Sequence, residues 1–370
     1  SDLSTHSGRS SRWTPWLLAY GVVVVGAVAL AVFRLHNDDA GFHIATGRWI
    51  RAHGHVPLVN PFSYVQDGAS WLQHQWLFAV GMSWLVDTFG VAGLVCAKAT
   101  VVGVVFSLLA WHLAHNRVAV GLGAVVLASA VVASAFRFYE RPFLASILAL
   151  TITSIALLRW HFDGLRGRRW PVLALVTTVL AWHLHSGALY SVLVWCALVG
   201  SCVVSAGLSW RAGGELRAES LRRFRLATVW FLACVGLSML GLWGLAPSGL
   251  DPMILPLRMS THTYWNEHLA EFRPLRLSAM YGLQWIGVGV AVAVIAGAAW
   301  RRHWFGVLLV AGMTYVACRH QRMVWAMMVV AVATLGNLPL SERLDRRLRL
   351  VGSRLALVFL ATLIIAMGWR

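Results

Sequence analysis

Long apolar stretches recur along the whole chain and are separated by short polar segments. Most of them are long enough for an α-helix to cross the hydrocarbon core of a bilayer, which takes roughly 20 residues. The pattern therefore predicts an all-α polytopic membrane protein with about eleven transmembrane helices. We place these helices at residues 16–35, 90–113, 118–136, 142–160, 170–184, 187–207, 226–246, 281–299, 303–318, 323–340 and 352–369.

Segment 71–89 has two interpretations, since it is apolar enough to cross the membrane and amphipathic enough to lie in its surface. The arginines favour the surface, because cytoplasmic loops carry an excess of Lys and Arg. If 71–89 is interfacial and the N-terminus is cytoplasmic, every arginine-rich loop lies inside. If 71–89 crosses the membrane, two of these loops move outside. The loops concerned are at 159–170, 210–225, 300–304 and 343–354.

This topology predicts a single transmembrane domain over residues 1–370, with 1–15 in the cytoplasm. A first outer loop at 36–90 contains juxtamembrane helices, and a second large outer loop covers 247–280. Ionisable residues near a bilayer are costly, so their concentration on one face indicates a functional site. The outer face collects ten of the fifteen histidines: His36, His43, His53, His55, His74, His183, His185, His262, His268 and His320.

Composition agrees with a membrane location, because 59% of the residues are hydrophobic and only 12% are charged, against about a quarter in soluble domains. The net charge of +17 comes almost entirely from arginine in short loops between apolar stretches. This placement is typical of topology determinants that face anionic lipid, so we exclude nucleic-acid binding. The five cysteines lie singly in apolar segments and indicate neither a disulfide framework nor a Cys metal site.

Two adjacent acids, Asp38 and Asp39, follow the first apolar stretch. Asn37 or Asp38 is suited to cap a helix that runs to about residue 52 and is stopped by Gly54 and Pro57. Asp39 and His43 share a face of that helix at i and i+4, a pairing suited to a general base or a metal site. Alternatively, Asp38 caps the helix and Asp39 is simply solvated at the favourable end of the helix dipole. An apolar stripe of Phe42, Ala45 and Trp49 favours a helix lying on the membrane.

Further outer residues fit the recognition of a phosphate. Arg137 and Arg141 flank Glu140 near a helix junction, where two guanidinium groups can grip a lipid phosphate. Glu140 is either a second acid or an internal ion-pair partner. Arg319 and Arg322, on either side of His320, are expected on one helical face at i and i+3, either for phosphate or for ordinary headgroups.

The segment "HLHSG" interrupts an apolar stretch and predicts a helix break near the outer surface. Its His183 and His185 are candidate ligands for a substrate or a metal ion. In the second large outer loop, four residues are expected on one short helix, as a substrate-binding lid or as a surface helix capping the bundle. They are His262, Glu267, His268 and Glu271.

The stretch "DAGFHIATGRWIRAHGHVPLVNPFSY", with the later "WLQHQWL", resembles a motif near the N-terminus of the proteins of a bacterial group within the GT-C superfamily. GT-C proteins are multi-pass membrane glycosyltransferases that use polyprenyl-phosphate-linked sugars. The resemblance is specific over about residues 38–77 and extends weakly to 183–187, 271–274 and 319–322. The matching positions are Asp39, His43, Gly47, Trp49, Gly54, Pro57, Pro61, Ser63, Trp71, His74 and Trp76.

The resemblance implies a bacterial inner-membrane enzyme with its site facing the periplasm. Asp39, or Asp38, would be the catalytic base or a metal ligand, and a polyprenyl-phosphate sugar in the outer leaflet would be the donor. His43, His183 or His185 would orient groups or bind a divalent metal ion. Asn60, where relatives often have Asp, and the lack of a soluble C-terminal domain favour an alternative, a catalytically silent subunit with membrane-protein partners. A transporter is less favoured, since paired broken helices are not evident.

Overall fold

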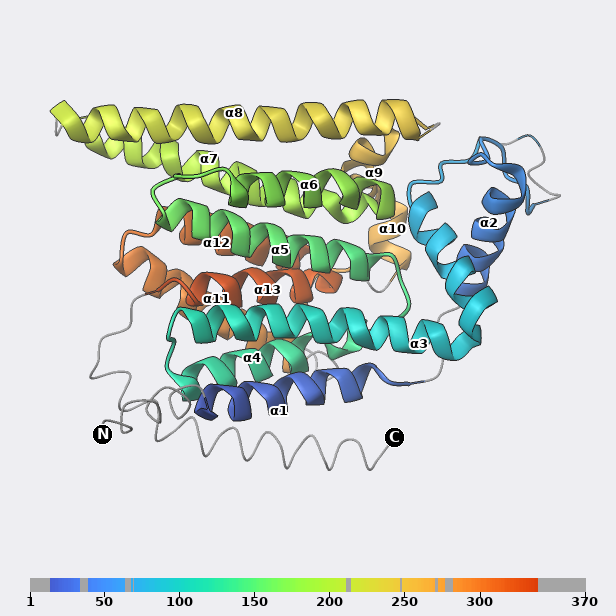
Figure 1. Cartoon of the computed structure of the whole chain (residues 1–370), viewed down its shortest axis with the longest axis horizontal. Helices are drawn as coiled ribbons and strands as arrows, with labels where there is room; N and C mark the ends of the chain where they lie inside the picture. Colours follow the sequence, from blue (N-terminus) through green and yellow to red (C-terminus); the bar gives the residue numbers. More distant parts are fainter. Residues whose placement is uncertain are drawn as a thin grey trace, which may run out of the picture.

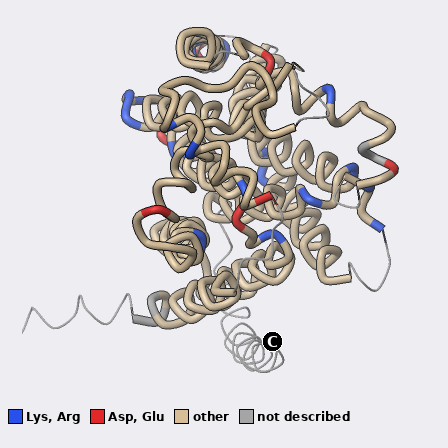
Figure 2. The backbone as a smooth tube through the Cα atoms, turned by 90° about the vertical axis from the view of Figure 1, so that its right-hand side faces the viewer, with Lys and Arg blue, Asp and Glu red and all other residues tan. Residues whose placement is uncertain are grey.

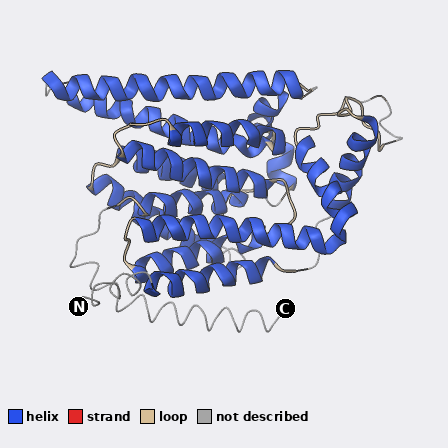
Figure 3. Cartoon of the chain, in the orientation of Figure 1, coloured by secondary structure: helices blue, strands red, loops and turns tan. Residues whose placement is uncertain are grey.

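The computed structural model describes residues 14–33, 39–63, 68, 70–210, 214–246, 248–269, 272–276 and 282–338. These residues are almost entirely helical and include no β-strand, apart from an isolated bridge between Val59 and Ser70 (Figure 3). The α-helices are α1 (Thr14–Ala31), α2 (Asp39–His53), α3 (Trp76–His115), α4 (Val120–Ser134), α5 (Phe143–Phe162), α6 (Arg169–Leu184), α7 (Leu189–Ser209), α8 (Gly214–Leu245), α9 (Asp251–Thr261), α10 (Thr263–His268), α11 (Gly282–Trp300), α12 (Trp304–Arg319) and α13 (Val324–Leu335).

The long helices run side by side as a bundle, with α2, α9 and α10 at one end (Figure 1). Among the described residues, six helical segments are long and apolar enough to cross a membrane, and three further apolar helices are shorter. The six are Trp76–His115, Val120–Arg137, Phe143–Phe162, Ser186–Ser209, Gly214–Leu245 and Gly282–Trp300. The all-α polytopic membrane architecture predicted from the apolar pattern is therefore confirmed.

Burial distinguishes central helices from peripheral ones. Every residue of α13 is buried, and most of α5 is buried, as expected for helices that are apolar on all sides. By contrast, α8 exposes large apolar side chains, among them Leu240 and Trp243. So much exposed apolar surface is unfavourable in water and is suited to contact with lipid. The bundle thus has a packed interior and an apolar exterior.

The helix α3 consists of two parts. Gly90 has φ +67° and ψ −169°, a conformation outside the helical region that glycine adopts readily, so the chain kinks there. The part before the kink packs against α2, while the part after it belongs to the bundle (Figure 1). The structure therefore separates the segment before Gly90 from the spanning helix, as expected for a juxtamembrane helix.

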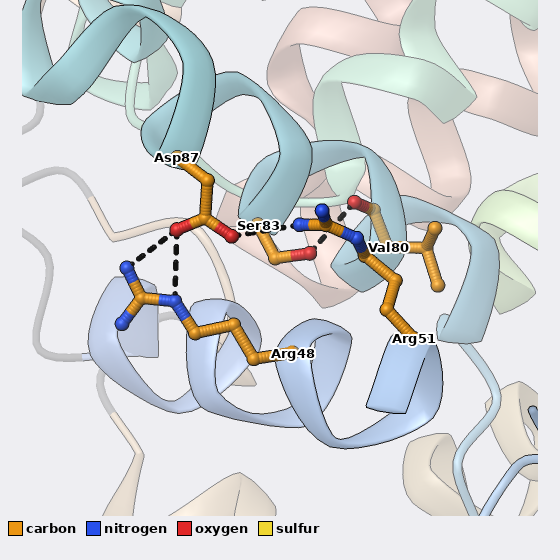
Figure 4. Close-up of polar contacts among 5 residues, drawn as sticks. All are labelled: Arg48, Arg51, Val80, Ser83 and Asp87. Atoms are coloured by element: carbon orange, nitrogen blue, oxygen red, sulfur yellow. Dashed lines mark hydrogen bonds and ion pairs between the residues drawn. The ribbon is translucent and has the colours of Figure 1, made fainter. Parts of the chain in front are cut away.

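Close approach and charge join α2 to the first part of α3. A Cβ atom at Gly47 would overlap the main chain of Ala79, so only glycine allows the two helices to come this close. On the exposed side, the Asp87 carboxylate accepts hydrogen bonds from Arg48 at 2.6 and 2.9 Å and from Arg51 at 2.7 Å (Figure 4). These contacts make the helix pair one unit at the end of the bundle.

Some predicted boundaries differ from the observed ones. The helix predicted at 226–246 begins earlier, at Gly214, because the arginine-rich segment before it continues the same helix. Segment 323–340 begins as a short 3-10 turn, η6 (Gln321–Met323), and its α-helix ends at Leu335. The span predicted at 352–369 lies outside the described residues.

Candidate functional site

The segments that carry most of the predicted site residues meet at the end of the bundle where α2, α9 and α10 lie. They are the start of α2, the residues before α3, the junction between the 3-10 turn η2 (Ala135–Arg137) and α5, the break after α6 and the break after α12. Figure 2 views the molecule from this end and shows acidic and basic positions on several chain segments there. Asp38 and Glu271, two of the predicted site residues, lie outside the described residues.

Asp39 is the first residue of α2, and its side chain is 57% exposed. One carboxylate oxygen lies 3.3 Å from a guanidinium nitrogen of Arg141, which precedes Pro142, the residue before α5. A negative charge at a helix N-terminus is favourable. The carboxylate is thus held by a cation from another segment and remains open to solvent, an arrangement that can accept a proton.

His43 lies one turn further along α2, and its side chain is almost completely buried. The ring packs edge-on against Phe78 at 5.8 Å, and the Gln75 amide nitrogen is 3.5 Å from Nδ1. Burial lowers the pKa of His43 to about 4, although the Asp39 charge acts in the opposite direction. His43 is therefore neutral at pH 7, and Asp39 lies close enough to affect its pKa, as the i, i+4 spacing predicted.

The apolar stripe of α2 has a different partner from the one predicted. Phe42 packs against Phe62 and Trp71, with ring centroids 5.7 and 5.4 Å away, so its contacts are with the following loop. The buried face of α2 is formed by Ala40, His43, Thr46, Gly47 and Ile50. Phe42 thus packs on the loop that follows the helix, and contact of the stripe with the membrane stays a prediction.

His185 forms the helix break that "HLHSG" predicted. Helix α6 ends at Leu184, His185 is extended with φ −169° and ψ 141°, and a 3-10 turn, η3 (Ser186–Ala188), follows. Its Nδ1 accepts a 3.0 Å hydrogen bond from the Gly187 backbone N–H and lies 2.8 Å from the Ser146 hydroxyl. Because Nδ1 accepts, the proton of the neutral ring resides on Nε2.

Positive charge surrounds this imidazole. Burial holds the pKa of His185 well below its ordinary value, and the charges of Arg322 and Arg137 act in the same direction. His185 therefore remains neutral among cationic neighbours and presents an Nε2–H group. A neutral donor beside guanidinium groups is suited to an anionic oxygen.

Arg137 and Arg322 converge near His185. Both act electrostatically on the buried Tyr190 side chain, with which Arg322 also forms a hydrogen bond. The Arg322 guanidinium lies 3.6 Å from the centroid of the Phe272 ring, and that of Arg137 lies 5.2 Å from the centroid of Phe143. Stacking on aromatic rings fixes the plane of each guanidinium and orients its N–H groups.

Arg319 does not share a helical face with Arg322, contrary to the prediction. Helix α12 ends at Arg319, and His320 adopts an extended conformation before η6 begins, so the i, i+3 geometry is lost. Arg319 is exposed, whereas Arg322 is partly buried. The tertiary structure thus pairs Arg322 with Arg137, which is far away in sequence.

His320 fastens the segment 272–276 to this break. Its Nδ1 donates to the Phe272 carbonyl at 2.9 Å. Two main-chain hydrogen bonds add to this contact, from Leu275 N–H to the Cys318 carbonyl at 3.0 Å and from Gln321 N–H to the Arg273 carbonyl at 3.1 Å. The described part of the first segment of weak resemblance, 272–274, therefore lies beside the second, 319–322, and this places Phe272 beneath Arg322.

Glu140 is an internal ion-pair partner. Its carboxylate pairs with Lys98 of α3, and both side chains are almost completely buried. The sequence left open whether Glu140 is a second acid, and the structure favours the ion pair. Lys98, which sequence reasoning did not single out, is the only lysine in the chain. Its position within an apolar stretch was the signal that could have revealed it.

Three of the predicted histidines lie apart from the Arg137–Arg322 cluster or have other contacts. His183 is buried, its ring 5.9 Å from Trp76, and its Nε2 faces Gly241 of α8. It therefore faces different neighbours from His185. His268 is exposed and stacks on Tyr264 within α10. His262 separates α9 from α10, so the single helix predicted for the lid residues is wrong.

Sequence reasoning left His74 out of the site. Its ring centroid is 6.0 Å from that of His185, and burial lowers its pKa from 6.5. His74 is one of the positions that match the motif of residues 38–77, and this match was the signal that could have placed it in the site. In the described part of the chain, no three His, Cys, Asp or Glu side chains are grouped so as to hold a metal ion.

Comparison with protein-family models and with curated protein sequences gives no match. Among solved structures, the fold is similar to that of an oligosaccharyltransferase from Archaeoglobus fulgidus, crystallised with a tethered acceptor peptide that contains the NVT sequon. The TM-score is 0.57 and the sequence identity is 14%, and the match covers 96% of this chain and 55% of that chain. This chain thus spans about half the length of the oligosaccharyltransferase. The expected all-α polytopic membrane fold is confirmed, and it is similar to the fold of this oligosaccharyltransferase.

Proposed function

We propose that the chain is a membrane glycosyltransferase that moves a sugar from a polyprenyl-phosphate carrier to an acceptor hydroxyl at the outer face of a bacterial inner membrane. The observation that carries this proposal is the position of a solvent-open carboxylate, Asp39, at the same end of a GT-C-type bundle as two converging guanidinium groups, Arg137 and Arg322. Such a site offers a proton acceptor and a phosphate-binding surface together.

The proposed step is a single displacement. The acceptor oxygen attacks the anomeric carbon, its proton passes to Asp39, and the bond between that carbon and the phosphate oxygen breaks. The lipid phosphate leaves with the bonding electrons. Arg137 and Arg322 stabilise the negative charge on the leaving phosphate, and the His185 Nε2–H donates to one of its oxygens. Arg141 holds the Asp39 carboxylate in place.

A divalent metal ion remains a prediction. The described residues supply one solvent-open carboxylate near the site, Asp39, and no group of three metal ligands. They do not by themselves make a metal site, so we derive no step through a metal ion. Transfer in the presence and absence of a chelator tests metal dependence directly.

One observation favours a second candidate, a catalytically silent subunit of a larger membrane complex. Two of the outer acids are engaged by cations, Glu140 by Lys98 and Asp39 by Arg141. Under this candidate the charges hold the fold together and membrane-protein partners use the outer surface. The two candidates differ in one measurable property, which is turnover.

Turnover can be tested without knowing the sugar. The purified chain is incubated in nanodiscs with a lipid extract from its native membrane, and mass spectrometry follows the release of free polyprenyl phosphate. We expect release by the unmodified chain and at least a hundredfold slower release by Asp39→Asn. The matched control is Asp251→Asn, which alters another exposed acid in an ion pair on α9. Equal release by Asp39→Asn and the unmodified chain would assign the base elsewhere. Absence of release by the unmodified chain favours the silent subunit.

A further inference from the structure

Lys98 and Glu140 form a buried ion pair at the outer end of the bundle, with side chains 1% and 3% exposed. Removing two charges from water is expensive, and their attraction often does no more than offset that cost. Apolar side chains of similar size are frequently as good for stability at such a position. Net stabilisation therefore does not explain why this chain places its only lysine here.

The geometry of the pair suggests another role, because three chain segments meet at it. Lys98 lies in α3, and Glu140 lies in the junction between η2 (Ala135–Arg137) and α5. The Lys98 ammonium is also 3.4 Å from the Phe33 carbonyl oxygen and 3.4 Å from the centroid of the Phe33 ring, just after α1. A charged, directional contact fixes these segments relative to one another more specifically than apolar packing does.

Two of these segments lead directly to the candidate catalytic carboxylate. Phe33 shortly precedes Asp39 in the sequence, and Glu140 directly precedes Arg141, which lies 3.3 Å from Asp39. The Phe33 ring also packs edge-on against Tyr139, with centroids 5.5 Å apart. The position of Arg141 therefore depends on Glu140, and the approach to Asp39 depends on Phe33.

We propose that Lys98 and Glu140 are positioning residues, which hold the end of α1 and the junction before α5 so that Arg141 meets Asp39. Neither side chain touches the substrate. The effect on transfer rests on the proposed function, whereas the effect on the position of the two segments does not. The test therefore needs one readout of each kind.

The main variant is Lys98→Met/Glu140→Leu, which replaces both charges by apolar side chains of similar size. We expect a melting temperature close to that of the unmodified chain. Hydrogen–deuterium exchange at residues 39–43 and 138–141 should become at least tenfold faster, because the segments are no longer held. The turnover number for phosphate release should fall at least tenfold with little change in KM, since donor binding by Arg137 and Arg322 is retained.

Arg258→Gln/Asp251→Asn serves as a control, because it removes another ion pair within α9. It should leave exchange at 39–43 and 138–141 unchanged. Glu140→Asp serves as a second variant that retains both charges and shortens the acid by one methylene. It should give an intermediate increase in exchange, which keeps the test decisive if the apolar variant fails to fold.

If the Lys98→Met/Glu140→Leu variant folds and exchange in both segments is unchanged, the proposal is overturned. If that variant does not fold, unchanged exchange in Glu140→Asp overturns it. Faster exchange with full turnover would overturn the catalytic consequence. If the unmodified chain shows no turnover, the proposed function fails, and exchange alone decides whether the pair positions the two segments.

Discussion

The Asp39 carboxylate of α2 lies 3.3 Å from the Arg141 guanidinium, and this contact joins α2 to the segment that leads into α5. Both side chains are partly exposed. Ion pairs of this kind contribute about 0–1 kcal/mol to stability, because solvent screens them and ordering the side chains costs entropy. The contact therefore matters more for where the carboxylate points than for how firmly the protein folds.

Arg141→Gln should accordingly slow transfer without unfolding the protein. We expect about a tenfold lower turnover number, because the carboxylate loses its orientation, and a melting temperature within about 2 °C of the unmodified chain. Arg141→Lys should retain part of the activity, since it keeps the charge but not the planar geometry. Measuring release of polyprenyl phosphate and melting temperature together checks this, and a large loss of stability would contradict it.

Stability should fall on acidification because His43 is buried in its neutral form. Its pKa of about 4 in the folded state lies below the ordinary value of 6.5, so the unfolded chain binds more protons between these values. The contribution is present above pH 6.5 and is lost as the pH falls towards 4. At pH 5 the protein has lost about 2 kcal/mol of this stability relative to pH 7. Melting temperatures at several pH values should show a smaller acid effect in His43→Gln, and an equal effect would contradict this account.

Gly47→Ala should destabilise the packing of α2 on α3, because the added Cβ would overlap the main chain of Ala79. Overpacking of this kind costs about 1–3 kcal/mol. Gly41→Ala is the matched control on the same helix, since a Cβ there meets nothing within 4 Å. Thermal unfolding should separate the two variants, with the control at least as stable as the unmodified chain. Equal stability of both variants would show that the helices can move apart.

Gly187→Ala should disturb His185, because a Cβ at this position would lie 2.6 Å from both the His185 Nδ1 and the Ser146 hydroxyl. We expect a lower affinity for the lipid donor, seen as a several-fold higher KM, since the Nε2–H no longer points to the phosphate. Gly207→Ala, where a Cβ meets nothing within 4 Å, is the control on α7. An unchanged KM in Gly187→Ala would remove His185 from the proposed donor site.

The membrane orientation can be measured by cysteine labelling. Arg319→Cys and Arg168→Cys place thiols at exposed positions at opposite ends of the bundle. We expect an impermeant thiol reagent added outside intact cells to label the first and not the second, because the arginine-rich loops are predicted to face the cytoplasm. The unmodified chain, with its own five cysteines, gives the background. Labelling of Arg168→Cys alone would reverse the topology and move the candidate site inside.

Sequence patterns alone were sufficient for the membrane class, most helix positions and the break at His185. Apolar length and arginine placement act locally or through the bilayer, so they can be read without knowing which helices are neighbours. The i, i+4 relation between Asp39 and His43 is likewise a property of one helix. The predicted span 90–113 likewise begins at Gly90, where α3 kinks.

Only the tertiary structure decided which distant residues are partners. Arg322 lies near Arg137 instead of acting with Arg319, because a helix break at His320 turns the chain and segment 272–276 packs beside it. Glu140 is paired with Lys98, and the local pattern around Glu140 does not show which cation is its partner. Helix periodicity determines what lies on one face of one helix, whereas contacts between helices depend on how whole faces pack, and a single sequence does not specify that packing.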